Sequence, residues 1–525
     1  MILGGAPFAA PARAAPVGVF DSTFPGGKAK VVDPTTGGVV VRNEVRPVVR
    51  ETILAPSMSF TPARNGFDIT LTYRNATSLP QPLGQIIIDG IMLGPVIDHW
   101  DFRGQGTPLV HDRRRAQVYV TGGLPYPQEL YSPVILLSDE RYTVGISLLY
   151  SAAEYLHPVT THTFSVGGRP ESDRSWSSGF HLRGDLPPGQ TRQYTLALRL
   201  MATDPSEPNG WVRTLTPYRD FFRQAYGTMR YTPDRRPVLA VHMSSPQLCK
   251  PSNPRGWVED TRRPDLYGWD GWVNWIPREM TRLGFDRVMI WAASGNYLHN
   301  QDENFPFLAL SPIKTEPALF STFGRLQTLP QRGPSEVGYW WGRSQEVMRV
   351  WDSPTSEILD PNNPDHVTRA MRELGVAVEL GAQAVGLDAF SKIPYYDAYH
   401  WLERMRARAP GVKFISELDA PDLIHLLGPT YLYGHQTDRP HLLADLLMPG
   451  HETWTQATFP AMAEMLGREL TLSERQAEIR RIAALGYIPV IMGDNGVPDR
   501  TLRAAESFRQ TIPPDLFDAP PPPPP

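Results

Sequence analysis

Residues 366–388 read HVTRAMRELGVAVELGAQAVGLD, and the pattern changes from helix to strand within this stretch. Apolar residues recur at helical spacing over residues 366–380, and a continuous apolar run follows at residues 384–388. A helix that leads into a strand buried on both faces is the repeating unit of a parallel α/β sheet. Asp388 closes this strand, and a lone carboxylate is costly to bury there without a partner or a purpose.

Eight apolar runs of this kind recur along the second half of the chain. They are residues 238–242, 287–291, 337–341, 384–388, 414–418, 430–433, 445–448 and 487–492. Amphipathic helices are predicted between several of them, over residues 274–283, 366–380, 396–408 and 474–485. Eight parallel strands that alternate with helices close into a barrel, so we predict a (β/α)8 TIM barrel over residues 237–513.

The first half of the chain has the pattern of an antiparallel β protein. Short segments rich in Val, Ile, Thr and Tyr are separated by Gly, Pro, Asn and Asp. In residues 67–73 the apolar residues alternate, as in a strand with one solvated face. We predict a β-sandwich domain over residues 17–204 and a linker with an aromatic helix over residues 205–236. Residues 514–525 form a Pro-rich tail.

Composition narrows the function classes. A chain of 525 residues exceeds one ordinary core, and a net charge of -4 offers no basic excess to attract nucleic acid. Cys249 is the single cysteine, which excludes an internal disulfide and disfavours a Cys-based metal site. The sequence contains no phosphate-binding glycine loop and no run of about 20 apolar residues. We therefore expect no nucleic-acid partner, no membrane span and no cofactor or metal.

Residues 1–16 have some features of an export-signal remnant. A short apolar run precedes the small residues around Ala12 and Ala14, although a basic segment is missing and Pro7 and Pro11 interrupt the run. This favours a periplasmic or secreted location slightly over a cytoplasmic one.

Acidic residues follow several predicted barrel strands, at the end where barrel enzymes place their chemistry. They are Asp388, Glu417, Asp419, Asp438 and Asp494. Two carboxylates that face each other across a barrel mouth are what glycosidic cleavage needs, one as acid and one as nucleophile or base. Four of them also have a structural alternative: Asp388 can cap a helix or pair with a neighbouring arginine, Asp419 can cap a helix, Asp438 can pair with Arg439, and Asp494 can belong to a turn.

Aromatic residues favour a sugar as the substrate. Ten of the 13 tryptophans lie in the barrel half, and flat rings stack on the apolar faces of pyranoses. The candidate substrate-binding residues are His242, Asp270, Trp291, Trp340, Trp341, Arg343 and Asp494. Asp270 belongs to residues 267–272, which we expect to form a polar-aromatic loop or a turn. Trp275 and Trp401, on predicted helices, are expected in the core.

The region around the third and fourth strands resembles the α-galactosidase (melibiase) clan of glycoside hydrolases. The similar segments are VGYWW at residues 337–341, LDPNNP at residues 359–364 and VGLD at residues 385–388. The resemblance implies a galactose mutarotase-like β-supersandwich followed by the barrel, Asp388 as nucleophile and Asp438 as acid/base.

The chain departs from this family at the nucleophile. The family usually has Lys-Trp-Asp where this chain has Gly386-Leu387-Asp388, so galactose specificity does not carry over. Glu417 and Asp419 remain rivals of Asp438 for the role of acid.

We predict a glycoside hydrolase that cleaves an α-linked bond in an oligo- or polysaccharide with retention of configuration. Asp388 attacks the anomeric carbon, and Asp438, or Glu417 or Asp419, acts as acid and then as base. Two alternatives stay open. One is a non-catalytic carbohydrate-binding protein on the same scaffold, and the other is a metal-assisted barrel hydrolase that uses His242 and Asp494.

Overall fold

The structure is a computed structural model of the 525-residue chain. It describes residues 17–21, 28–32, 39–43, 46–63, 65–93, 98–100, 106–108, 120–138, 142–166, 174–202, 204, 206–207, 209–242, 268–291, 293, 321–348, 356–417, 420–433, 440–457, 459–492 and 513–516. The chain divides into two compact units, with the boundary between Ala225 and Tyr226.

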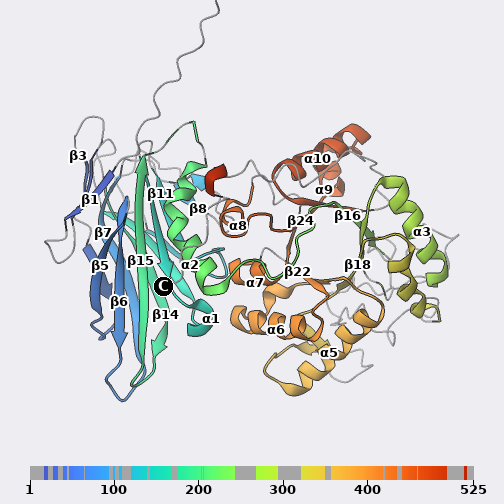
Figure 1. Cartoon of the computed structure of the whole chain (residues 1–525), viewed down its shortest axis with the longest axis horizontal. Helices are drawn as coiled ribbons and strands as arrows, with labels where there is room; N and C mark the ends of the chain where they lie inside the picture. The colour runs from blue at the N-terminus through green and yellow to red at the C-terminus, as the bar shows by residue number, and fades with distance from the viewer. Residues whose placement is uncertain are drawn as a thin grey trace, which may run out of the picture. The chain divides into compact units, whose positions relative to one another are not determined.

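The first unit is an antiparallel β-sandwich (Figure 1). One five-stranded sheet has the order β10 (Val120–Tyr126), β13 (Val159–Val166), β14 (Arg174–Leu186), β7 (Gln81–Leu93) and β4 (Arg46–Arg50). The other has the order β11 (Val134–Ser138), β12 (Tyr142–Leu149), β15 (Thr191–Ala202), β6 (Gly66–Arg74) and β5 (Ser57–Ala63). Smaller sheets join β1 (Val17–Asp21), β2 (Lys28–Val32) and β3 (Val39–Asn43), and β8 (Asp98–Trp100) and β9 (Gly106–Pro108).

The alternation read in residues 67–73 is present in the structure. Strand β6 has every second side chain buried, which gives it one core face and one more exposed face. Among the helical segments of this unit are α1 (Ala152–Tyr155), the 3-10 helix Gly210–Leu215 and α2 (Thr216–Tyr226), the last where the sequence predicts an aromatic helix. The β-sandwich architecture predicted from sequence is confirmed.

The second unit is a closed barrel of eight parallel strands (Figure 1). Their order is β16 (Val238–His242), β17 (Arg287–Trp291), β18 (Glu336–Trp341), β21 (Ala384–Leu387), β22 (Lys413–Glu417), β23 (Thr430–Tyr433), β24 (Thr453–Gln456) and β25 (Ile488–Met492). The described α-helices are α3 (Gly268–Leu283), α5 (Pro364–Glu379), α6 (Tyr395–Arg408), α7 (Asp422–Leu427), α8 (Leu442–Leu447), α9 (Phe459–Leu466) and α10 (Leu472–Ala484). The predicted (β/α)8 barrel is confirmed.

Local signals explain where two of these helices begin. Asn363 caps α5 by accepting a hydrogen bond from the N–H of Asp365, and a proline follows the cap. At α10, Thr471 and Glu474 form a reciprocal capping box. Within the described segments, no helix is both long and apolar enough to cross a membrane.

The seventh strand is not where the sequence predicts it. The predicted run at residues 445–448 falls largely within helix α8, and the strand is β24, which reads TWTQ. Every residue of α8 is buried, so its hydrophobic pattern has no period that separates helix from strand. Strand β24 is rich in β-branched and aromatic residues, which is the signal that identifies it.

Two glycines let large side chains cross the barrel interior. A Cβ atom added at Gly386 would lie 1.9 Å from the ring of Trp340, and one added at Gly338 would lie 2.6 Å from the terminal methyl of Met289. Trp340 and Met289 belong to the interior cluster, which consists of Val238, Ala240, Met289, Trp340, Ala384, Ile415, Tyr431, Trp454, Ile488 and Val490. The space above Gly386 is therefore filled by an indole ring.

Candidate active site

Two carboxylates stand side by side at the carboxyl end of the barrel. The parallel register pairs Leu387 of β21 with Ser416 of β22, so the next residues, Asp388 and Glu417, are neighbours across the strand ends. Side chains alternate along a strand, and an even number of residues separates Asp388 from Ala384 and Glu417 from Ile415, so both acids lie on the same inward face as these interior residues. Neighbouring strands lie about 4.8 Å apart, which brings the two side chains to the same part of the barrel mouth.

Asp388 is half-buried and is held by N–H donors. Its Oδ2 accepts a hydrogen bond of 2.7 Å from the backbone N–H of Arg343, and the indole Nε1 of Trp340 lies 3.5 Å from its Oδ1. The hydroxyl of Ser344 donates to the Asp388 carbonyl at 2.7 Å. The guanidinium of Arg343 pairs instead with Glu346, with 2.9 Å between Nε and Oε1. The carboxylate is therefore positioned by dipoles, and this guanidinium does not neutralise it.

Glu417 is more buried, with 6% of its surface exposed. Its Oε2 accepts a 2.9 Å hydrogen bond from the N–H of Ala389, the residue that follows Asp388. Ala389 has φ 50° and Arg343 has φ 52°, both in the left-handed region. That conformation costs a residue with a side chain roughly 1–2 kcal/mol, and backbone strain of this kind clusters at functional sites. Each carboxylate thus accepts a hydrogen bond from the backbone N–H of a residue in the left-handed conformation.

Three rings next to the two carboxylates form what we call the aromatic floor, defined as Trp291, Trp340 and Tyr431. Trp291 stacks on Trp340 with 4.8 Å between ring centroids and 20° between planes, and Tyr431 lies 5.0 Å from Trp340. Trp291 is partly exposed, whereas the other two rings are buried. The hydroxyl of Tyr431 donates to Oε1 of Gln456 at the end of β24.

Two residues of this site, Tyr431 and Gln456, are not among those predicted from the sequence. Gln456 was missed because the seventh strand was assigned to the wrong segment. Tyr431 sits inside a short apolar run, where a tyrosine looks like any other core residue. Gln456 lies two residues after the interior residue Trp454 on the same strand, and this spacing is the signal that points it into the barrel.

Three predicted substrate-binding residues take different positions. Asp270 lies in the first turn of α3, where it forms an exposed 3.0 Å ion pair with Arg325, so the predicted loop is a helix from Gly268 onward. Trp341 is 1% exposed and has the opposite parity to Trp340, so it faces away from the barrel interior. Arg343 contributes its backbone N–H while its guanidinium is engaged elsewhere.

Of the other candidate residues, the structure describes His242 but not Asp419, Asp438 or Asp494. His242 ends β16 with the interior parity of Val238 and Ala240, and it is half-buried near the mouth. Asp419, Asp438 and Asp494 lie outside the described residues. Among the residues that are described, no three His, Cys, Asp or Glu side chains are grouped so that they could hold a metal ion. Trp401 is buried, as expected, and Trp275 is partly buried.

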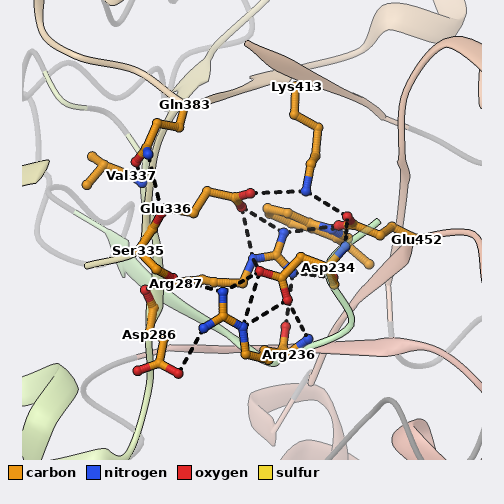
Figure 2. Close-up of polar contacts among 11 residues, drawn as sticks. Asp234, Arg236, Asp286, Arg287, Ser335, Glu336, Val337, Gln383, Lys413 and Glu452 are labelled. Carbon is orange, nitrogen blue, oxygen red and sulfur yellow. Dashed lines mark hydrogen bonds and ion pairs between the residues drawn. The ribbon is translucent and has the colours of Figure 1, made fainter. Parts of the chain in front are cut away.

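The amino end of the barrel also contains carboxylates, and these are paired with cations (Figure 2). We define the charge cluster as Asp234, Arg287, Glu336, Lys413 and Glu452. Arg287 Nη2 lies 2.7 Å from Glu336 and 3.0 Å from Glu452, and Lys413 Nζ lies 2.6 Å from Glu452. Arg287 and Glu452 have fully buried side chains.

Charge pairing outweighs burial in this cluster. Burial alone would raise the pKa of the Glu452 carboxyl, but Arg287 and Lys413 reverse the effect and hold that pKa below its usual value. Burial likewise disfavours the charged form of Arg287, yet its acidic neighbours raise its pKa. Each charge thus depends on the others, and the position at the amino end of the strands fits a stabilising role.

No protein-family model matches the chain, and no curated protein matches it. Several solved structures are similar. An alpha-galactosidase from Thermus thermophilus in complex with stachyose is 12% identical, covers 88% of this chain and 98% of its own, and has a TM-score of 0.42. An alpha-amylase from Geobacillus thermoleovorans complexed with acarbose is 12% identical, with 55% and 77% coverage and a TM-score of 0.32.

The glycoside hydrolase domain of PelA from Pseudomonas aeruginosa is also similar. It is 13% identical, covers 50% of this chain and 83% of its own, and has a TM-score of 0.22.

Proposed function

We propose that this protein is a glycoside hydrolase that cleaves an α-linked bond in an oligo- or polysaccharide with retention of configuration. The observation that carries the proposal is the pair Asp388 and Glu417, adjacent at the barrel mouth beside an aromatic floor. Paired carboxylates perform this reaction, and the rings supply the apolar surface on which a pyranose rests. The α linkage rests on the sequence resemblance around the fourth strand.

Asp388 is the nucleophile in this proposal. It attacks the anomeric carbon and forms a glycosyl-enzyme ester, while the leaving oxygen takes a proton from the acid. Its two oxygens are positioned by the N–H groups of Arg343 and Trp340, which carry no net charge that would neutralise the carboxylate. Carboxylates on adjacent strands suit the separation of about 5–5.5 Å that retaining enzymes use, rather than about 6.5–9.5 Å for inverting ones.

Glu417 is the acid and then the base. It lies on the strand next to Asp388 and is the more buried of the two carboxyl groups. After the first step, Glu417 accepts a proton from the water that hydrolyses the ester. Asp438, which the resemblance implies, and Asp419 are the rivals for this role.

A glycan panel tests the proposal. Wild type should release reducing sugar from at least one α-linked glycan. Asp388→Asn should lose activity by on the order of 10³-fold or more, and Glu464→Gln, an exposed carboxylate on α9, should retain it. If wild type binds glycans but cleaves none, the protein is a non-catalytic binder. If a chelator abolishes cleavage, a metal-assisted reaction replaces the proposal.

Azide assigns the two roles. Azide that replaces a missing nucleophile attacks the substrate directly, so Asp388→Ala should yield a glycosyl azide of inverted configuration. Azide that attacks the glycosyl-enzyme ester yields a retained product, which is the result expected for Glu417→Ala with an activated aryl glycoside. If Glu417→Ala keeps full activity on natural glycans and Asp438→Ala or Asp419→Ala gives the retained azide, the acid is one of those residues.

A further inference from the structure

On the side of the barrel across from Asp388, strand β24 ends in the amide side chain of Gln456. In the ring of eight strands, β24 lies three positions from β21, so its end is nearly opposite Asp388. Gln456 is the last residue of β24 and has the same parity as Trp454, a member of the interior cluster. It is half-buried, which places its amide group at the rim of the mouth above the aromatic floor.

The orientation of this amide is set from below. The Tyr431 hydroxyl donates to Oε1 of Gln456, and the Tyr431 ring is itself buried against Trp340, with 5.0 Å between centroids. An amide has one acceptor oxygen and an NH2 group with two donors. Because its oxygen is engaged by Tyr431, Gln456 presents the NH2 group to the mouth. Within the described part of the chain, no residue accepts a hydrogen bond from that NH2 group.

A fixed donor of this kind discriminates between sugars. A hydroxyl or acetamido oxygen can accept its hydrogen bond, whereas the ammonium group of an amino sugar has three donors and no acceptor. A donor that meets another donor loses its partner in a partly desolvated site, which costs about 1–3 kcal/mol or about 5- to 150-fold in affinity. The side of the ring remote from the anomeric carbon is the side that would meet Gln456.

We propose that Gln456 is a specificity-determining residue, whose amide N–H donates to an oxygen of the sugar ring seated over the aromatic floor. It selects neutral rings with a hydroxyl or acetamido group at that position over rings with an ammonium group. The inference rests on the proposed glycosidase function, because that function places the anomeric carbon at Asp388. Tyr431 is the positioning residue that keeps the amide in this orientation.

The test replaces the donor by an acceptor of the same shape. Gln456→Glu still accepts from Tyr431 but offers a carboxylate to the substrate. It should raise KM for a neutral glycan by about 10- to 100-fold with little change in kcat, because the lost contact is remote from the reacting bond. The ratio of kcat/KM for the neutral glycan to that for its deacetylated or amino analogue should fall by at least as much. Gln193→Glu, an exposed glutamine on β15, is the matched control.

Tyr431→Phe tests the orienting contact. Without the hydroxyl, the amide can rotate and offer its oxygen, so the neutral-to-amino ratio should move toward one by a smaller factor than in Gln456→Glu. A purely structural role would lower kcat/KM equally for both substrates. If wild type cleaves glycans and neither variant changes the ratio, the inference is overturned while the proposed function stands. If wild type cleaves nothing, the proposed function fails and the inference fails with it.

Discussion

The two ends of the barrel both place carboxylates inside the ring of strands, but they hold them differently. At the amino end, Glu452 lies between Arg287 and Lys413, and all three belong to the charge cluster (Figure 2). At the carboxyl end, Asp388 and Glu417 accept hydrogen bonds from the backbone N–H groups of Arg343 and Ala389. The amino end pairs full charges, and at the carboxyl end backbone N–H groups orient Asp388 and Glu417.

This difference separates stability from chemistry. A carboxylate buried between two cations cannot be removed without leaving a buried charge uncompensated. A carboxylate held by N–H groups keeps a fixed position and can still form a bond to a substrate atom. A carboxylate-to-amide substitution should therefore mainly lower stability at the amino end, whereas at the mouth it should mainly lower activity.

The largest effect on stability is expected for Glu452→Gln. The variant removes the negative charge that faces Arg287 and Lys413, and breaking a buried pair costs about 3–5 kcal/mol. Urea unfolding followed by tryptophan fluorescence should give a lower midpoint than wild type. An unchanged midpoint would mean that water or a rearranged Glu336 compensates the cations, and the cluster would then not be a stabilising feature.

The next effect concerns a histidine cluster near the charge cluster, made of His425, His441 and His451. The ring centroids lie 5.0 to 6.2 Å apart, and all three residues are buried. His451 Nε2 lies 2.9 Å from Asp445 Oδ1, and its Nδ1 lies 2.9 Å from the Thr453 hydroxyl. Burial lowers the pKa of His425 and of His451 well below the usual 6.5, with further lowering from His451 and Arg235 respectively, so both rings are neutral in the folded state.

The sign of the pH dependence follows from these lowered pKa values. Below about pH 6.5 the unfolded chain binds protons that the folded chain does not. Stability should be constant above that pH and should fall as the pH decreases, by about 1.4 kcal/mol per pH unit for each neutral buried ring. Urea midpoints measured from pH 8 to pH 5 should show this slope. Equal midpoints at pH 7.5 and pH 5.5 would contradict the prediction.

A variant pair isolates the contribution of the cluster. His157 in the β-sandwich has its pKa lowered to about 4, mainly by burial, so it adds to the slope in the same pH range. His451→Gln should flatten the slope by the share of one ring of the cluster, and His157→Gln should flatten it by the separate share of the β-sandwich histidine.

A smaller effect is expected for Gly386→Ala. The added methyl group would lie 1.9 Å from the Trp340 ring, and overpacking of this kind costs about 1–3 kcal/mol. Moving Trp340 also disturbs the Trp291 stack, so activity should fall with stability. Gly375→Ala in α5 is the control, because open space surrounds that glycine and alanine in a helix should stabilise by about 0.5–1 kcal/mol.

The smallest effect on stability is expected for Asp388→Asn. The amide oxygen can still accept from the N–H of Arg343, and a half-buried position that is not part of an ion pair should change stability by less than about 0.5 kcal/mol. Activity should nevertheless be lost. A fall in stability comparable to that of Glu452→Gln would show that Asp388 is a structural residue.

Much of the fold could be predicted from sequence because the barrel strands are short apolar runs between amphipathic helices. Helix α8 and strand β24 could not be separated, since α8 is buried on every side and carries no periodic signal. The start of α3 was mistaken for a loop because its glycines and tryptophans resemble a turn, although Trp269 and Trp272 are core residues. In both cases the local sequence pattern fits more than one secondary structure, and tertiary packing determines which one forms.

The sequence by itself determined the alternation of strands and helices over most of the barrel half and the acidic residue that ends the fourth strand, because hydrophobic period and strand ends are local properties. Only the tertiary structure decided that Glu417 stands beside Asp388, that Trp340 covers Gly386 and that Gln456 faces them across the mouth. Those relations depend on the register between strands and on closure of the barrel, which no segment encodes alone.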